Sequence, residues 1–154
     1  MEASPELLAL RQKVEKYLRH GLSRVEAHGE RYLVRAGSAA VLVHPFQLAA
    51  GTTLVRLLVP ALEGVAAAGN EGMFREFSRL NDELLFGKIY WAPKATDDDT
   101  VGTIYLEHVL LGEYLDAEEL LSALTALALA ADRIDDDLQA KYGGERWTDP
   151  PGTT

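Results

Sequence analysis

The chain has 154 residues, of which 47% are hydrophobic and 25% are charged, with a formal net charge of -9 and no cysteine. This length and composition are typical of one globular domain, and the negative charge argues against binding to nucleic acid or to an anionic membrane surface, since both require a cationic face. The lack of cysteine excludes disulfides, thiol catalysis and thiolate zinc sites. We find neither an apolar run long enough to span a membrane nor a secretion signal, and we expect a cytoplasmic protein.

The first element is predicted to be a long amphipathic helix over residues 5–28. Ser4 can cap this helix, and Pro5 suits its first position, where a backbone N–H has no helical partner. Gly21 weakens the helix midway, and Gly29 supplies a stop signal. Apolar residues recur between these signals at the spacing of one helical face: Leu7, Leu10, Val14, Tyr17, Leu18, Leu22 and Val25.

Three short strands are predicted to follow. Residues 31–36 and 39–44 are rich in Val, Leu and Tyr, and the dipeptide Gly37-Ser38 between them suits a tight hairpin turn. Residues 52–59 form the third strand, with Arg56 facing water, and we expect Pro60 to stop it because proline cannot donate to a sheet ladder. The small, glycine-punctuated segment 61–69 is predicted to be an ordered loop.

A second helix is predicted from Asn70, which can cap it, to Gly87. Its apolar face consists of Met73, Phe74, Phe77, Leu80 and Leu84. Two further strands, 88–92 and 101–111, then form a hairpin around the polar segment 93–100. Within the second of these strands Glu107 and His108 are adjacent, so their side chains must point to opposite faces of the sheet.

The third helix has the clearest start signal in the chain. Asp116 can cap it, Glu119 completes a capping box, and apolar residues continue at helical spacing as far as Gly143-Gly144. The predicted order is therefore α-β-β-β-α-β-β-α, which makes an α+β single-domain sandwich with an antiparallel sheet covered by helices. We expect this domain to occupy residues 1–144 and to be followed by a flexible C-terminal tail over residues 145–154, which contains Trp147.

Two segments of the chain carry a family resemblance. The first is Leu80-Asn81-x-x-Leu84-Leu85-Phe86-Gly87-Lys88-Ile89-Tyr90. The second is Leu115-Asp116-Ala117-Glu118-Glu119-Leu120, continued by Ala131-Asp132-Arg133-Ile134-Asp135-Asp136-Asp137-Leu138 and Tyr142-Gly143-Gly144. With this element order, the chain resembles the YbjN-like and type III secretion class I (CesT-like) chaperone-like superfamily over about residues 5–144. The resemblance implies a small homodimer that binds peptide segments of a client protein without catalysis and without a cofactor.

Candidate contact residues come from the resemblance and from the strand pattern. Carried over by position, the dimer seam would include Phe74, Phe77, Ile89 and Trp91; the alternative is that these residues lie in the core of the monomer. Ile89, Tyr90 and Trp91 follow one another, so apolar groups point to both faces of the sheet, and an aromatic pair on an open face would be an interaction patch. The candidate peptide-binding surface consists of Leu7, Val14, Leu18, Tyr90 and Trp91.

Acidic residues concentrate in the third helix, where Asp132, Asp135, Asp136 and Asp137 form a cluster. Closely spaced carboxylates can hold a divalent cation, but we identify no converging ligand on another element. The other interpretations are a solvated acidic face and an acidic groove that attracts basic peptides. The run Asp97-Asp98-Asp99 lacks the alternating ligands of a calcium loop, which indicates a surface loop.

Other catalytic patterns are missing from the sequence. The four histidines (His20, His28, His44 and His108) do not show the spacing of a zinc pair on adjacent helical turns, and they are interpreted as buried or interface residues or as pH-sensitive contacts. There is no phosphate-binding glycine loop and no Gly-x-Ser-x-Gly elbow.

Three functional hypotheses remain. The leading one is a non-catalytic, dimeric peptide-binding or chaperone-like protein whose partners are a second copy of itself and a client protein, with neither nucleic acid nor membrane. The second is a structural or regulatory dimer without a client. The third is a metal-dependent enzyme that uses the cluster at residues 132–137.

Overall fold

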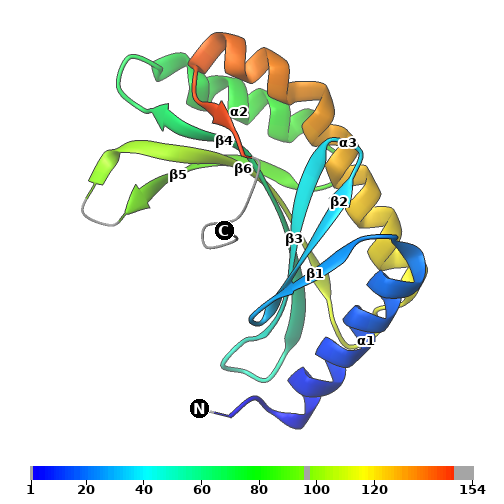
Figure 1. Cartoon of the computed structure of the whole chain (residues 1–154). Helices are drawn as coiled ribbons and strands as arrows, with labels where there is room; N and C mark the ends of the chain where they lie inside the picture. Colours follow the sequence, from blue (N-terminus) through cyan, green and yellow to red (C-terminus); the bar gives the residue numbers. More distant parts are fainter. Residues whose placement is uncertain (1, 96–97, 148–154) are drawn as a thin grey trace.

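One antiparallel sheet and three helices make up the described part of the chain in the computed structural model, residues 2–95 and 98–147 (Figure 1). The helices are α1 (Pro5–Gly21), α2 (Glu71–Glu83) and α3 (Ala117–Tyr142). The strands are β1 (Val25–His28), β2 (Arg31–Ala36), β3 (Ala39–Gln47), β4 (Thr53–Ala66), β5 (Lys88–Ala95), β6 (Asp98–Leu111) and β7 (Glu145–Arg146). The predicted α+β class with an antiparallel sheet is confirmed.

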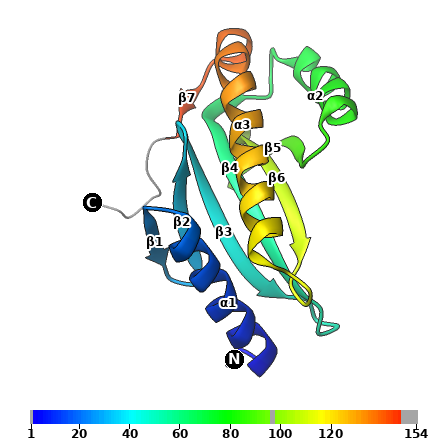
Figure 2. The same ribbon diagram turned by 90° about the vertical axis from the view of Figure 1, so that its right-hand side faces the viewer.

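The strands lie side by side in the order β1-β2-β3-β4-β6-β5, and each neighbouring pair is antiparallel. β7 pairs with β4 at Leu62 and Glu63. The sheet is strongly curved, and the helices follow its outer side in Figure 1, with α1 and α3 lying in front of the strands in Figure 2. Within the described residues, no helix has both the length and the hydrophobicity that are needed to cross a membrane.

The core lies between the sheet and the helices. Apolar side chains of α1 and α3 pack against the outer face of β2, β3, β4 and β6, with the largest fully buried ones at Leu18, Leu57, Leu106, Leu120 and Leu124. Both helices begin as predicted. The Ser4 side chain accepts a hydrogen bond from the Leu7 N–H (3.1 Å), and Asp116 Oδ1 accepts one from the Glu119 N–H (2.8 Å).

The first helix is shorter in the structure than the predicted range of residues 5–28. α1 ends at Gly21, Leu22 is already extended, and Val25–His28 form β1. The apolar residues that continued the helical pattern serve a strand instead, because Val25 and Ala27 pair with Val34 and Tyr32 of β2. Gly29, at φ +60°, turns this hairpin rather than ending a helix.

The predicted ends of several strands are also wrong. β4 does not stop at Pro60 but continues to Ala66 through the segment predicted to be a loop. The sheet tolerates this proline because the β4–β6 register shifts between Pro60 and Leu62, so a ladder hydrogen bond is already missing there. The predicted polar loop 93–100 is mostly strand, with Asp97 outside the described residues. Glu145 and Arg146, predicted to be tail, form β7, whereas residues 148–154 lie outside the described residues.

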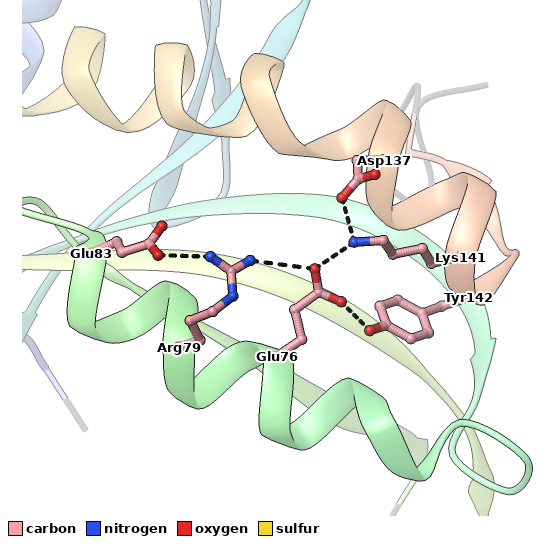
Figure 3. Close-up of polar contacts among 6 residues, drawn as sticks. All are labelled: Glu76, Arg79, Glu83, Asp137, Lys141 and Tyr142. Carbon is pink, nitrogen blue, oxygen red and sulfur yellow. Dashed lines mark hydrogen bonds and ion pairs between the residues drawn. The ribbon is translucent and has the colours of Figure 1, made fainter.

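The second helix is shorter than predicted and lightly buried. α2 ends at Glu83, and only Met73 and Phe77 are buried among its described residues. A polar network adds to this contact by joining α2 to the end of α3 (Figure 3). Glu76 accepts hydrogen bonds from Lys141 (2.8 Å) and from the Tyr142 hydroxyl, and Lys141 also pairs with Asp137 (2.8 Å).

The charge state of Glu76 is coupled to this docking. The hydrogen bonds from Lys141 and Tyr142 lower the pKa of Glu76 below its ordinary value, because both stabilise the ionised carboxylate. Partial burial and the bond to Glu76 raise the pKa of Tyr142 to about 12. Because the pKa of Glu76 is lower in the folded state, its stabilising effect is present above the ordinary carboxyl pKa and is lost as the pH falls through the folded value.

We predict that Glu76→Gln lowers the free energy of unfolding by about 1–3 kcal/mol at neutral pH, because charge-assisted hydrogen bonds are lost from a largely buried position. The difference from the wild-type chain should shrink as the pH falls below about 4. Urea unfolding followed by circular dichroism measures both effects. Glu83→Gln is the control, since its carboxylate is exposed and its one ion pair with a described residue is to Arg79 on the same helix. A difference that stays constant down to acid pH would contradict the assignment.

Candidate functional site

The inner, concave face of the sheet carries none of the helices that the described residues form (Figure 1). Side chains alternate along a strand, so residues that do not join the core point to this side. We call this surface the open face. It consists of Arg31 and Arg35 of β2; Leu42, His44 and Phe46 of β3; Leu54, Arg56 and Leu58 of β4; Lys88 and Tyr90 of β5; and Tyr105, Glu107, Val109 and Leu111 of β6.

Apolar side chains of the open face meet across the central strands. Leu42 pairs with Leu58, and Leu54 pairs with Leu111. Val109 and Leu111 keep 39% and 61% of their surface exposed. Exposed apolar side chains that adjoin one another on one face are typical of a protein–protein contact surface.

Glu107 lies at the centre of the open face, and its side chain is only 7% exposed. Its Oε2 accepts a hydrogen bond from the Tyr90 hydroxyl (2.6 Å), and its Oε1 lies 3.4 Å from Lys88 Nζ and 3.7 Å from Arg56 Nε. Burial, followed by the bond to Glu107, raises the pKa of Tyr90 above its ordinary value, so its hydroxyl keeps its proton and donates this hydrogen bond at physiological pH. Two cations and one donor thus offset a single buried carboxylate.

Aromatic rings surround this centre. The Tyr90 and Tyr105 rings lie 5.6 Å apart, and the Arg56 guanidinium lies 5.0 Å above the Phe46 ring. The His44 ring also stacks on the Phe46 ring, and their centroids are 5.6 Å apart. Burial, and secondarily the charges of Arg31 and Arg56, lower the pKa of His44, so this side chain is neutral at neutral pH.

Trp147, which follows β7, lies at one end of the open face. Trp147 lines a hollow of about 510 Å³ together with His28, Arg31, Leu42, Leu58, Pro60, Glu63 and Tyr105. This hollow combines apolar walls with two side chains that can carry a positive charge, His28 and Arg31, and with one carboxylate, Glu63. Sequence reasoning did not place Trp147 here, because the position of β7 beside β4 depends on a pairing between segments that are distant in the sequence.

The candidate peptide-binding residues from the sequence do not come together. Tyr90 lies on the open face, but Trp91 points to the helix side, where its Nε1 donates to the Val65 carbonyl (2.9 Å). Val14 and Leu18 are fully buried between α1 and the sheet, so no client can reach them in this structure. Leu7 is half-buried near the start of α1, beside Pro45 and Phe46. Of the five, only Tyr90 belongs to the open face.

The candidate seam residues lie together on the helix side. Phe77 and Ile89 are buried in the core, which agrees with the alternative that they belong to the monomer. Trp91 is half-buried, and the Phe74 ring packs edge-on against it at 6.3 Å. Only Phe74, at 49% exposure, presents a large apolar surface to solvent.

The acidic cluster of α3 engages other segments of the chain. Asp132 accepts a hydrogen bond from the Ser38 hydroxyl at the β2–β3 turn (2.5 Å). Arg146 of β7 pairs with Asp135 (3.2 Å) and with Asp136, and Lys141 pairs with Asp137. Within residues 2–95 and 98–147, no three acidic, histidine or cysteine side chains are grouped as ligands for a metal ion. The cluster therefore acts chiefly as an anchor for neighbouring elements.

Glu107 and His108 of β6 point to opposite faces of the sheet, as their adjacent positions in the strand predict. Glu107 faces the open side, whereas His108 faces the helix side, where its ring contacts Phe86 at 5.7 Å. Arg56 faces outward as expected, since its side chain is 41% exposed. The alternation in β4 and β6 was therefore the sequence signal that could have located the open face.

We predict that Tyr90→Phe lowers the free energy of unfolding by about 1–3 kcal/mol, because it leaves the buried Glu107 carboxylate without its donor. Tyr105→Phe is the matched control: its ring packs on Tyr90, but its hydroxyl makes no hydrogen bond to another described residue, and the change should stay within about 0.5 kcal/mol. Chemical denaturation measures both variants. Equal effects of the two substitutions would show that the Tyr90–Glu107 bond contributes little.

Two solved structures are similar to this chain. The crystal structure of YbjN from E. coli has the same fold, with a TM-score of 0.57 and 11% sequence identity over 82% of this chain and 91% of that one. The Yersinia pestis type III secretion chaperone SycH, solved in complex with a stable fragment of YscM2, gives a TM-score of 0.48 and 18% identity over 80% of this chain and 98% of that one. No curated protein matches the chain.

A family model provides the assignment. The model described as "T3SS (YopN, CesT) and YbjN peptide-binding chaperone 1" matches residues 9–150. This match covers most of the chain and confirms the resemblance that the sequence motifs indicated. The chain therefore belongs to the family of T3SS (YopN, CesT) and YbjN peptide-binding chaperones.

Proposed function

We propose that the protein is a non-catalytic chaperone that binds a segment of a client protein across the open face of its sheet. The observation that carries this proposal is an apolar, partly exposed sheet face without a covering helix, in a chain whose family consists of peptide-binding chaperones. Val109 and Leu111 supply exposed apolar surface, and Phe46, Tyr90, Tyr105 and Arg56 supply the aromatic and arginine side chains that dominate binding energies at protein interfaces.

A second copy of the chain is a poorer occupant of this face. A two-fold symmetric interface brings the same patch of both copies together. On the open face this would place Arg56 and Lys88 of one copy near the same cations of the other, and like charges in an interface oppose association. This argument favours a client over the alternative in which self-association is the entire function.

Homodimerisation belongs to the proposal, but on the helix side of the sheet. Leu85 is 93% exposed and Leu129 is 53% exposed, and both line a hollow of about 310 Å³ between the end of α2 and the outer surface of α3. Phe86, Ala126 and Ala130 extend the same apolar lining. We propose that a second copy covers these side chains, because a patch of this kind is costly to leave in water.

The client proposal predicts that a phage-displayed library of random peptides yields binders when it is selected on the full chain. Val109→Ser with Leu111→Ser should weaken the selected peptides by about tenfold or more, because two apolar contacts are lost from the open face. Leu8→Ser is the control, since Leu8 is exposed on α1 at the outer side. Fluorescence anisotropy with labelled peptides measures the affinities. No enrichment, or equal binding by the double variant, would refute the proposal.

The dimer proposal predicts a mass in solution of about twice 16.9 kDa for the wild-type chain. Leu85→Glu should shift this mass to that of the monomer, because it places a charge in the apolar contact. Leu8→Glu, at an exposed position of α1, should leave the dimer intact. Light scattering after size-exclusion chromatography distinguishes these states. A monomeric wild-type chain, or a dimeric Leu85→Glu variant, would show that this surface does not join two copies.

A further inference from the structure

The charges of the molecule are divided between its two sides. Seven acidic and two basic residues lie between Asp116 and Tyr142, the segment of α3 on the helix side. On the open face basic residues are in the majority: Arg31, Arg35, Arg56 and Lys88 lie on the same side as the carboxylates of Glu107, of Glu26 on the edge strand β1, and of Glu63 beside the hollow. A chain with a formal net charge of -9 thus presents a cationic surface where we place the client.

Burial increases this difference at the centre of the open face. The Glu107 side chain is 7% exposed and is held by the Tyr90 hydroxyl, whereas the side chains of Arg56 and Lys88 are 41% and 61% exposed. The negative charge is therefore withdrawn from the surface, and the two positive charges face the solvent. A molecule that contacts this centre meets the cations first.

Arg56 has unused capacity to donate hydrogen bonds. Its Nε is buried without a hydrogen-bond partner, and it lies 3.7 Å from Glu107, beyond hydrogen-bond distance. The guanidinium makes no hydrogen bond to any residue in the described part of the chain, and its outer edge stacks only on Phe46. Because Nε is buried, it is the exposed end of this guanidinium, its two Nη groups, that can bind a carboxylate with two parallel hydrogen bonds.

We propose that the open face selects acidic client segments, in which apolar side chains alternate with aspartate or glutamate. The apolar side chains would pack on Leu58, Val109 and Leu111, and the carboxylates would pair with Arg56, Lys88 and Arg31. This inference rests on the proposed function and specifies its partner. It reverses the expectation of an acidic groove for basic peptides, because the acidic cluster lies on the opposite side of the sheet and is engaged by Ser38, Arg146 and Lys141.

The test uses two labelled peptides with the same leucine and phenylalanine positions, one with glutamate and the other with lysine between them. Fluorescence anisotropy with the full chain should show the glutamate peptide binding about tenfold or more tightly than the lysine peptide at about 50 mM salt. The preference should fall to about threefold or less at about 0.5 M salt, where exposed charges are screened.

Two double variants locate the effect. Arg31→Gln with Lys88→Gln removes two exposed cations of the open face and should abolish the preference for glutamate. Lys16→Gln with Arg75→Gln removes the same charge from exposed positions of α1 and α2 and should preserve it. Circular dichroism verifies that both variants are folded.

The outcomes separate the inference from the function on which it rests. Equal or tighter binding of the lysine peptide would overturn the acidic preference and leave peptide binding intact. An equal loss in both double variants would assign the preference to overall charge and would also overturn the inference. Binding of neither peptide would contradict the proposed function itself.

Discussion

The packing of α1, α2 and α3 against a single face of the sheet is the constraint on which the rest of the structure depends. Each helix must bury one apolar stripe, and the outer face of the sheet supplies the main partner among the described elements. Leu18, Leu120 and Leu124 are fully buried there. The inner face therefore receives no helix from the described residues, and its alternate side chains are left partly in contact with water.

That arrangement gives Glu107 a structural role on the open face. A curved sheet with one open side needs apolar contacts between strands, but a uniformly apolar surface would promote aggregation. Glu107, held by Tyr90 and flanked by Arg56 and Lys88, places polar groups in the middle of Leu58, Val109 and Leu111 without leaving a buried charge unpaired. In our proposal, the exposed side chains of Arg56 and Lys88 above this buried carboxylate give the open face its attraction for acidic partners.

Local signals in the sequence predicted much of the fold. The caps at Ser4 and Asp116 and the Gly37-Ser38 turn depend on neighbouring residues, and all three were located correctly. Errors arose where strand pairing overrides the local pattern: Val25 continues a helical pattern but pairs with Val34 in the next hairpin, and Pro60 lies at a register shift opposite the distant strand β6. The same limit applies to the site, because only the register of β4, β5 and β6 shows that Tyr90 and Glu107 share a face whereas Trp91 does not.

The most direct test of the central claim is methyl NMR of the full chain with a selected peptide bound. Because leucine and valine methyl groups lie on both sides of the sheet, one spectrum compares the two surfaces. Our account predicts that the peptide shifts the methyl signals of Leu42, Leu54, Leu58, Val109 and Leu111 and leaves those of Leu8, Leu85 and Leu129 unchanged. Shifts confined to the helix side would show that the client binds elsewhere, and the open face would lose its proposed role.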